Sequence, residues 1–338
     1  MKAVVYRAYG SPEVVLRCED VAKPVPGDGE VLVRVRAAAA NPLDYHLMAG
    51  AYLIRLFTGL RKPKPTRPGR DLAGEVEAVG AKVTAFRPGD AVFGLSRATF
   101  AEYVSAREKE LVLKPASLGF EQAAALPVAG LTALQGLRDK GRIQPGQKVL
   151  INGAGGGVGT FAVQIAQSFG TAVTGVCSTG KVDLVRSLGA DHVVDYTGDD
   201  FTRSGERYDL IFDGVGNRPL SACRRVMTRK GTFVAVGVRP GGRWIGPLPH
   251  LLGLLASAPF VSQRVVPFIA RGSREDLLEL TRLIAANKLT PVVDRRYPLS
   301  EAPEAVRYLK EGHARGKVVI TMEDHLPPPG GASVIAGI

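Results

Sequence analysis

An apolar segment that runs straight into a glycine-dense turn is the feature that most constrains how this chain can fold. Residues 149–159 read VLINGAGGGVG, and apolar positions then recur at helical spacing as far as Gly170. Glycines let backbone N–H groups approach phosphate oxygens, and the helix turns its positive end toward them. The segment predicts a dinucleotide pyrophosphate site, although Ala154 stands where the strict pattern has its first glycine; a glycine turn without a ligand is the alternative. The expected donors are the N–H groups of Gly156, Gly157, Val158 and Gly159.

The next strand predicts which nucleotide is bound. It covers Thr171–Val176 and ends about twenty residues after the glycine turn, where an NAD site has an acidic residue for the ribose. No acid stands there; the hydroxyls of Ser178 and Thr179 and the ammonium of Lys181 suit a 2′-phosphate instead. NADPH is therefore the predicted cofactor. The alternative is that Lys181 is a solvated lysine and that Asp183 binds the ribose.

Cysteine usage and apolar patterning favour a reducing compartment. The three cysteines, Cys18, Cys177 and Cys223, are far apart and odd in number, so neither a disulfide framework nor a cysteine-bound zinc is implied. The N-terminus reads as a strand and lacks the apolar core of a secretion signal. The longest apolar stretch, residues 251–261, is interrupted and too short to span a bilayer. We expect a cytoplasmic protein without a transmembrane segment.

The net charge of +12 raises the question of polyanionic partners. The 44 lysines and arginines are spread along the chain without a run of five, so most of the charge is expected on a solvated surface and part of it beside an anionic cofactor. A nucleic-acid partner is not predicted. Weak binding to nucleic acid or to an acidic membrane face stays open as an alternative.

Length and patterning predict two domains. The chain has 338 residues, 45% of them hydrophobic, which is enough for two cores. Up to about residue 122, short strands alternate with turns, as in an all-β domain; from there on, strands alternate with helices, as in a doubly wound parallel sheet. The strands expected in the first part are Glu30–Ala38, Leu72–Val79, Ala91–Gly94 and Phe100–Val104. Those expected in the second are Lys148–Asn152, Thr171–Val176, Tyr208–Phe212, Gly231–Val236 and Arg264–Ile269.

The C-terminal part is expected to leave the parallel sheet. Beyond Arg271, a helix with Leu277, Leu280 and Ile284 on one face leads to short strands at 292–293 and 317–320. These elements are expected to return to the first domain. The Pro- and Gly-rich residues 324–338 are expected to form a flexible tail.

Several spaced motifs occur in the order found in one enzyme family. They are Asn41-Pro42-Leu43-Asp44, residues 68–74 (PGRDLAG), residues 124–133 (AALPVAGLTA), the glycine turn, and residues 312–317 (GHARGK). In these motifs, over about residues 1–322, the chain resembles the zinc-free branch of the medium-chain dehydrogenase/reductase superfamily, the quinone oxidoreductases related to zeta-crystallin. It looks most similar to the chloroplast-envelope and reticulon-interacting quinone oxidoreductase homologues.

The resemblance implies an α/β fold with two domains. It implies a GroES-like β domain made of residues 1–122 and 271–323, and a Rossmann domain with a doubly wound parallel sheet, residues 123–270, that binds NADP(H). The active site would lie in the cleft between the domains, and the Rossmann sheet edge would form a homodimer.

The same comparison argues against zinc. Gly69-Arg70-Asp71 stands where zinc-dependent relatives have Gly-His-Glu, and Asn41 stands near their metal-binding cysteine. The four-cysteine loop that binds structural zinc cannot be formed from three scattered cysteines. A zinc-free enzyme is predicted, with Arg70 as an ion-pair residue, for example with Asp71.

The resemblance also names candidate catalytic residues. Asn41 is expected near the nicotinamide, where it would donate a hydrogen bond to a substrate carbonyl or to the ribose; an asparagine that satisfies a turn is the alternative. Asp44 would cap the following helix or orient a neighbour. Tyr45, His46 and Tyr52 would shape the pocket or supply a proton, and core packing of either tyrosine is an equal alternative.

Further residues are candidates for cofactor contacts. By resemblance, Thr132 meets the nicotinamide and Tyr196 lies close to the 2′-phosphate and adenine; a threonine inside a helix is the alternative for the former. Val236 and Gly237 end a strand at the carboxyl edge of the sheet, where ligands bind in open α/β sheets. Lys317 would add a phosphate contact or be a solvated lysine.

The predicted function is a zinc-independent, NADPH-dependent reductase of quinones or α,β-unsaturated carbonyls. Without a metal to bind an alkoxide, hydride transfer to a conjugated acceptor is easier than alcohol oxidation, because delocalisation spreads the developing charge. The alternatives are a metal-free carbonyl or alcohol oxidoreductase, and a non-catalytic NADPH-binding protein that binds RNA or a membrane surface.

Overall fold

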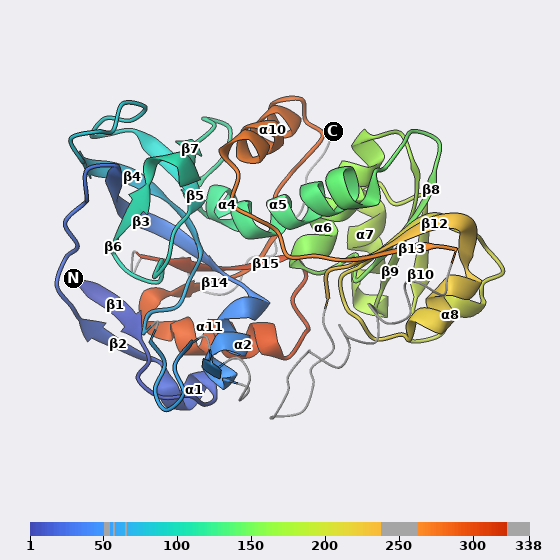
Figure 1. Cartoon of the computed structure of the whole chain (residues 1–338), viewed down its shortest axis with the longest axis horizontal. Coiled ribbons are helices and arrows are strands. Elements are labelled where there is room, and N and C mark those ends of the chain that lie inside the picture. The colour runs from blue at the N-terminus through green and yellow to red at the C-terminus, as the bar shows by residue number, and fades with distance from the viewer. Residues whose placement is uncertain (51–54, 57, 65, 238–261, 323–338) are drawn as a thin grey trace.

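Two β-sheets, connected by a layer of helices, organise the chain (Figure 1). The computed structural model describes residues 1–50, 55–56, 58–64, 66–237 and 262–322. Tyr52, residues 238–261 and the predicted tail lie outside the described residues. None of the helices in those ranges is long and apolar enough to cross a membrane.

The right side of Figure 1 shows a parallel sheet, which has six strands in the order β10-β9-β8-β11-β12-β13. Its strands are β8 (Lys148–Asn152), β9 (Ala172–Cys177), β10 (His192–Asp195), β11 (Tyr208–Asp213), β12 (Met227–Ala235) and β13 (Arg264–Pro267). Helices α6 (Gly157–Ser168), α7 (Val182–Ser187) and α8 (Leu220–Arg225) connect them, with short 3-10 turns at Thr179–Lys181 and Phe201–Arg203. The central strands β8, β9 and β11 are mostly apolar and buried, as the inner strands of a parallel sheet are expected to be. The predicted doubly wound sheet is confirmed.

The other half holds a seven-stranded sheet in the order β14-β15-β3-β4-β5-β7, with β6 paired to β3. Its strands are β3 (Glu30–Ala40), β4 (Asp71–Val79), β5 (Ala91–Leu95), β6 (Tyr103–Arg107), β7 (Leu111–Leu113), β14 (Val293–Pro298) and β15 (Lys317–Thr321). A two-stranded sheet of β1 (Lys2–Val5) and β2 (Arg17–Asp20) lies beside it, with helices α1 (Pro12–Val15), α2 (Pro42–Ala49) and α11 (Ala302–Lys310) and short 3-10 turns at Glu108–Glu110 and Leu299–Glu301. Because β15 pairs antiparallel with β3, the C-terminal strands join the sheet of the N-terminal segment.

One predicted strand is displaced. The pattern predicts a strand over Phe100–Val104, but β6 begins at Tyr103. Phe100 is fully buried and its carbonyl accepts the N–H of Val4 (2.8 Å), so this segment bonds to β1 before it reaches β3. Burial, and not membership of β6, therefore explains the apolar residues at the start of the predicted strand.

Helices between the sheets make one continuous core. They are α4 (Phe120–Ala125), α5 (Pro127–Leu134), the π-helical segment Gln135–Gly141 and α10 (Arg274–Ala285). Buried Phe93 comes from the seven-stranded sheet, and Ile151, Phe161 and Phe212 come from the half with the six-stranded sheet. All four belong to the same apolar cluster. The predicted apolar face of α10 is buried against α5, which orients the two halves.

Candidate active site

The glycine turn leaves backbone donors outside the helix that follows it. A Cβ atom on Gly159 would lie 2.0 Å from the carbonyl oxygen of Gly153, so no larger residue fits. The first bond inside α6 runs from Thr160 N–H to Gly156 O (3.0 Å), which leaves the N–H groups of Val158 and Gly159 without a partner inside the helix. Gly156 differs from the prediction. Its own N–H donates to Gly153 O (3.0 Å) and is not free for a phosphate.

A buried carboxylate braces the point at which the order of the parallel strands reverses. Asp213, at the end of β11, accepts hydrogen bonds at Oδ1 from Asn152 Nδ2 (2.8 Å) and Val215 N–H (3.1 Å). Its backbone oxygen accepts the N–H groups of Val236 (3.0 Å) and Gly237 (2.9 Å). A Cβ atom on Gly237 would lie 2.4 Å from the nitrogen of Val215. These contacts bring Val236 and Gly237 to the carboxyl edge of the sheet, beside the end of β8.

Lys181 covers the glycine turn and is tied to the other half of the molecule. A Cβ atom on Gly155 would lie 2.8 Å from Lys181 Cδ, so the lysine stem packs on the turn. Its Nζ donates to Ala314 O (2.7 Å), between α11 and β15. Burial lowers the pKa of Lys181. The alternative of a solvated lysine is wrong, and the ammonium has further N–H donors besides the one that Ala314 accepts.

The sequence prediction missed an acid at the end of the strand next to β9. Asp195 ends β10, pairs in register with Cys177, and accepts the N–H (3.0 Å) and hydroxyl (2.8 Å) of Thr197. Thr179, a predicted contact, shares a hydrogen bond with Thr197 (2.8 Å), and its hydroxyl helps to lower the pKa of Asp195. Tyr196 follows directly and is 49% exposed. The signal that could have found Asp195 is its position at the end of the strand after β9.

The neighbouring Ser178 and Asp183 differ in environment. Ser178 is half-buried at the end of β9. The side chain of Asp183 is 99% exposed and lies 3.9 Å from Arg186, one turn along α7. The alternative ribose ligand is thus a solvated helix residue in this structure.

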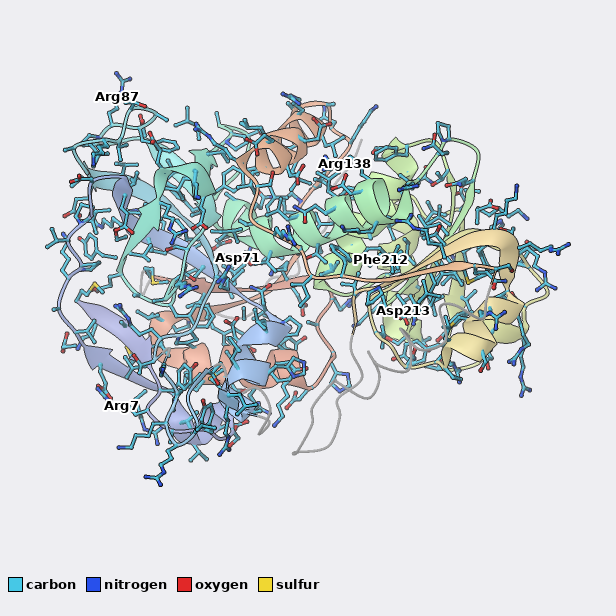
Figure 2. All side chains as sticks on the ribbon, in the orientation of Figure 1. Arg7, Asp71, Arg87, Arg138, Phe212 and Asp213 are labelled. Carbon is cyan, nitrogen blue, oxygen red and sulfur yellow. The ribbon has the colours of Figure 1, made fainter. Side chains whose placement is uncertain are left out.

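A second buried carboxylate, Asp71, joins four segments of the chain. Its Oδ1 accepts the N–H of Val128 (2.8 Å) at the start of α5, where the helix dipole favours a negative charge. Its Oδ2 accepts Asn41 Nδ2 (3.0 Å) and Lys317 Nζ (3.1 Å). Figure 2 shows Asp71 near the middle of the molecule, between the two halves. We call Asn41, Asp44, Asp71 and Lys317 the polar hub.

Lys317 connects the polar hub to the glycine turn. Its side chain is 4% exposed and that of Asp71 is fully buried. A Cβ atom on Gly157 would lie 3.0 Å from Lys317 Cδ, and Gly156 forms a parallel bridge with Gly316. Both the predicted phosphate contact and the alternative of a solvated lysine are wrong for Lys317, because its ammonium is buried and bonded to the Asp71 carboxylate.

The amide of Asn41 is almost fully used inside the hub. Nδ2 donates to Asp71 Oδ2 (3.0 Å) and to Ala39 O (3.2 Å), and Oδ1 accepts from Lys317 Nζ (2.7 Å). A primary amide has two N–H donors and two acceptor lone pairs. The predicted donation to a substrate carbonyl is therefore wrong for this arrangement. One lone pair of Oδ1 is left, which can accept a hydrogen bond from a hydroxyl group.

Asp44 holds backbone in place. It is 3% exposed, and its two oxygens accept the N–H groups of Asn41 (2.8 Å) and Gly69 (3.1 Å). These bonds cap the start of α2, as the capping alternative predicted. Burial raises the pKa of Asp44 to about 6, while the two backbone bonds oppose that rise.

The aromatic candidates lie on α2. Tyr45 and His46 are half-buried, with ring centroids 4.1 Å apart. Burial raises the pKa of Tyr45 and lowers that of His46. At neutral pH the tyrosine is thus a proton-bearing phenol and the histidine a neutral ring. Tyr45 also packs against the apolar cluster around Met48, in line with the core-packing alternative.

Thr132 occupies the interior of α5. It is 8% exposed, and its hydroxyl donates to Val128 O (2.6 Å) one turn earlier. This is the helix-interior alternative, and it leaves the oxygen of Thr132 able only to accept. The N–H of Val128 donates to Asp71, so the N–H and the carbonyl of Val128, in the first turn of α5, are both bonded to side chains.

The positions of zinc ligands hold other chemistry. Asn41 belongs to the hub, and Arg70 does not pair with Asp71, so that expected ion pair is wrong; the partner of Asp71 is Lys317. Arg70 lines a separate groove with Ser96 and Arg97. Across the described ranges, no group of three histidine, cysteine or acidic residues could hold a metal ion.

Comparison with known proteins agrees with this geometry. Residues 27–116 match the family described as "Alcohol dehydrogenase GroES-like domain", and residues 188–320 match "Zinc-binding dehydrogenase". The chain is 34% identical to the 2-methylene-furan-3-one reductase of Solanum lycopersicum, over 95% of this chain and 79% of that protein. It is 32% identical to the chloroplast envelope quinone oxidoreductase homolog of Arabidopsis thaliana, over 95% and 98%. The chain belongs to the quinone oxidoreductase family of medium-chain dehydrogenases/reductases.

The same family appears among solved structures. The Escherichia coli quinone oxidoreductase, solved as a complex with NADPH, superposes with a TM-score of 0.81 at 25% identity, over 95% of this chain and 100% of that one. The GroES-like and Rossmann folds that the sequence resemblance implied are thereby confirmed for this member of the quinone oxidoreductase family.

Proposed function

We propose that this protein is a zinc-independent, NADPH-dependent reductase of quinones or α,β-unsaturated carbonyls. The observation that carries the proposal is the contact between the glycine turn and the polar hub, made by Lys317 under Gly157 and by the bridge between Gly156 and Gly316. This contact places a glycine turn of the kind that binds nucleotides next to the buried polar hub. The described residues contain no group of side chains that could hold a metal ion. A quinone oxidoreductase homolog and an enone reductase among the relatives support the substrate class.

The residues present fit NADPH. The N–H groups of Val158 and Gly159 would bind the pyrophosphate, and Ser178 and Lys181 would bind the 2′-phosphate, with Tyr196 beside them. Asn41 would accept a ribose hydroxyl at Oδ1. When bound, the cofactor supplies the hydride.

The chain's own residues would orient the acceptor and manage the proton. Asn41 is held by Asp71 and Lys317, so its amide cannot rotate as a ligand arrives. Tyr45 keeps its proton at neutral pH and would donate a hydrogen bond from Oη to the substrate oxygen, where negative charge develops. Thr132 would contribute an acceptor oxygen near the nicotinamide.

The decisive assay follows NADPH oxidation by chelator-treated protein against 1,4-benzoquinone, 9,10-phenanthrenequinone and medium-chain enals and enones, with NADH in parallel. Preferential turnover of NADPH with a reduced C=C bond or quinone supports the proposal. A reduced C=O bond would favour the carbonyl oxidoreductase instead. Activity that disappears on chelation and returns with zinc would contradict zinc independence.

Domain limits, assembly and location complete the proposal. We assign residues 1–122 and 271–323 to the catalytic domain and 123–270 to the cofactor domain, with 324–338 as a tail. A cytoplasmic homodimer is proposed, and light scattering of the purified protein tests the assembly. Cys177 and Cys223 are buried free thiols, which suits a reducing compartment.

A further inference from the structure

An arginine-rich groove lies on the sheet of the N-terminal half and plays no part in the function proposed above. Its volume is about 340 Å³, within the order of size of small-molecule sites. Segments around β4, β5 and β6 line it. Its charged side chains are Arg67, Arg70, Arg97, Arg107, Glu30 and Glu110.

The four arginines keep most of their charge, although Glu30 partly offsets that of Arg107, which helps to lower the pKa of Glu30. No ion pair joins any of them to a carboxylate within the described residues, whereas Arg36 of the same sheet pairs with Glu75 at 2.9 Å. Glu30 is already engaged, because its Oε2 accepts Ser105 Oγ (2.7 Å) and Gly27 N–H (3.2 Å), bonds that lower its pKa. Four arginines against two glutamates leave the lining with a net charge of +2.

The backbone that carries these arginines is fixed before any ligand arrives. Ser96 is 7% exposed; its N–H donates to Arg70 O (3.0 Å) and its hydroxyl to Ser105 O (3.1 Å). One buried serine thus ties the start of β4 and the middle of β6 to the end of β5. Such preorganisation lowers the entropic cost of binding.

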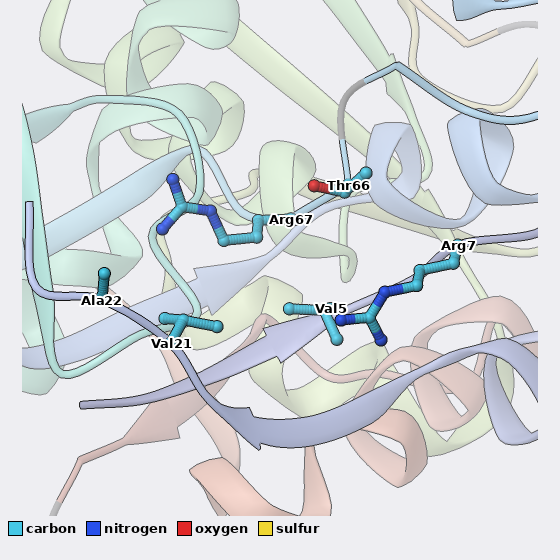
Figure 3. A pocket seen from close by; sticks show the side chains of 6 residues that line it. All are labelled: Val5, Arg7, Val21, Ala22, Thr66 and Arg67. Carbon is cyan, nitrogen blue, oxygen red and sulfur yellow. The ribbon is translucent and has the colours of Figure 1, made fainter.

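A neighbouring hollow helps to define the limits of this site. Arg67 also borders it, together with Val5, Arg7, Val21, Ala22 and Thr66 (Figure 3). There Arg7 donates two bonds to Glu19 (2.5 and 2.7 Å), so its charge is already paired. The unpaired positive charge is therefore concentrated in the arginine-rich groove.

We propose that this groove binds a small phosphate-bearing anion with at least two negative charges. Guanidinium groups bind phosphate oxygens with paired hydrogen bonds, and several of them around one hollow match a ligand of more than one charge. The groove is concave and too small for a macromolecule, which favours a free small ligand over a membrane or a nucleic acid. Tyr103, in the lining, carries Lys23 Nζ 3.8 Å from its ring centroid, but this ammonium is paired with Glu77 and adds no free charge at the rim.

Calorimetric titration with sodium pyrophosphate tests this site. The measurement is made on the full chain at low ionic strength, with and without saturating NADP⁺, which separates the groove from the nucleotide site. The variant Arg97→Gln/Arg107→Gln changes two exposed groove residues that have no role in the polar hub. Arg225→Gln/Arg229→Gln, also exposed, removes the same charge from the other half of the molecule and serves as the matched control.

We expect one saturable site that persists with NADP⁺, an affinity at least about tenfold lower in the groove variant, and little change in the control. Equal losses in both variants would show a net-charge effect and overturn the proposal. So would binding that NADP⁺ abolishes, or the absence of saturable binding. Each of these outcomes is independent of whether the protein reduces quinones.

Discussion

The glycine turn and the polar hub meet at the same site but are built in opposite ways. The turn is one run of consecutive residues, whose shape depends on missing side chains and whose N–H groups at Val158 and Gly159 have no partner inside α6. The hub joins side chains up to 276 positions apart, and its polar atoms are bonded to one another. The turn is thus prepared to bind a ligand, whereas the hub is prepared to hold its own geometry.

The largest effect is expected from breaking the ion pair of the hub. Lys317→Met leaves the Asp71 carboxylate buried without its cation, which should lower the free energy of unfolding by about 3–5 kcal/mol. Urea denaturation measures this change. Lys148→Met is the matched control, because Lys148 pairs with Glu206 at 2.8 Å on the surface, and solvent screens that pair.

The double variant Lys317→Met/Asp71→Asn sharpens the result. If the Lys317→Met variant is destabilised because Asp71 is left as an unpaired buried charge, neutralising Asp71 should recover part of the free energy of unfolding lost in Lys317→Met. A loss in Lys317→Met no greater than in Lys148→Met would show that the hub is not a structural pair at all.

The second prediction concerns pH and separates Asp44 from the rest of the hub. Burial raises its pKa from 3.8 to about 6, so the folded protein binds the proton more tightly than the unfolded chain. That contribution is complete below the unfolded pKa and is lost as the pH rises toward 6. Relative to Asp44→Asn, the wild type should lose about 3 kcal/mol of unfolding free energy between these limits.

Urea denaturation of both proteins at several pH values measures that difference. Comparing the change with pH removes any constant cost of placing an amide at Asp44. A difference that stays flat across this range would mean that Asp44 ionises normally in the folded protein.

The contrast between turn and hub also explains what the sequence could predict. The turn and most strands of the parallel sheet follow from contiguous patterns. The hub depends on strand register: Ala39 lies opposite Asp71 and Ala40 opposite Val318, which brings Asn41, Asp71 and Lys317 together. Register between distant strands is set by tertiary packing, so the sequence named Asn41 and Lys317 as candidates but assigned Asp71 the wrong partner.

The third prediction tests the turn itself. In Gly159→Ala the new methyl group would lie 2.0 Å from Gly153 O, and the start of α6 must move. We expect NADPH to bind at least about tenfold more weakly, a loss of about 1.4 kcal/mol or more. Gly198→Ala is the control, because a Cβ atom there meets nothing within 4 Å. Fluorescence titration with NADPH measures both, and equal affinities would remove the turn from the cofactor site.

The smallest effect is expected at the junction between the two regions, where Lys181 on the turn side bonds Ala314 near the hub strand β15. Asp195→Asn removes a half-buried negative charge bonded to Thr197, close to the predicted 2′-phosphate contacts. Affinity for NADPH should rise about threefold relative to NADH at low salt, and the gain should shrink at high salt because salt screens charges that solvent reaches. Asp183→Asn is the comparison, since Asp183 is the other acid that the sequence offered for the ribose. If Asp183→Asn weakens the binding of NADH while Asp195→Asn changes nothing, the preference between the two nucleotides depends on α7, on a residue that follows β9 directly in the sequence. If only Asp195→Asn changes the binding, the preference depends on the pairing of β9 with β10, which, like the polar hub, brings together residues that are distant in the sequence.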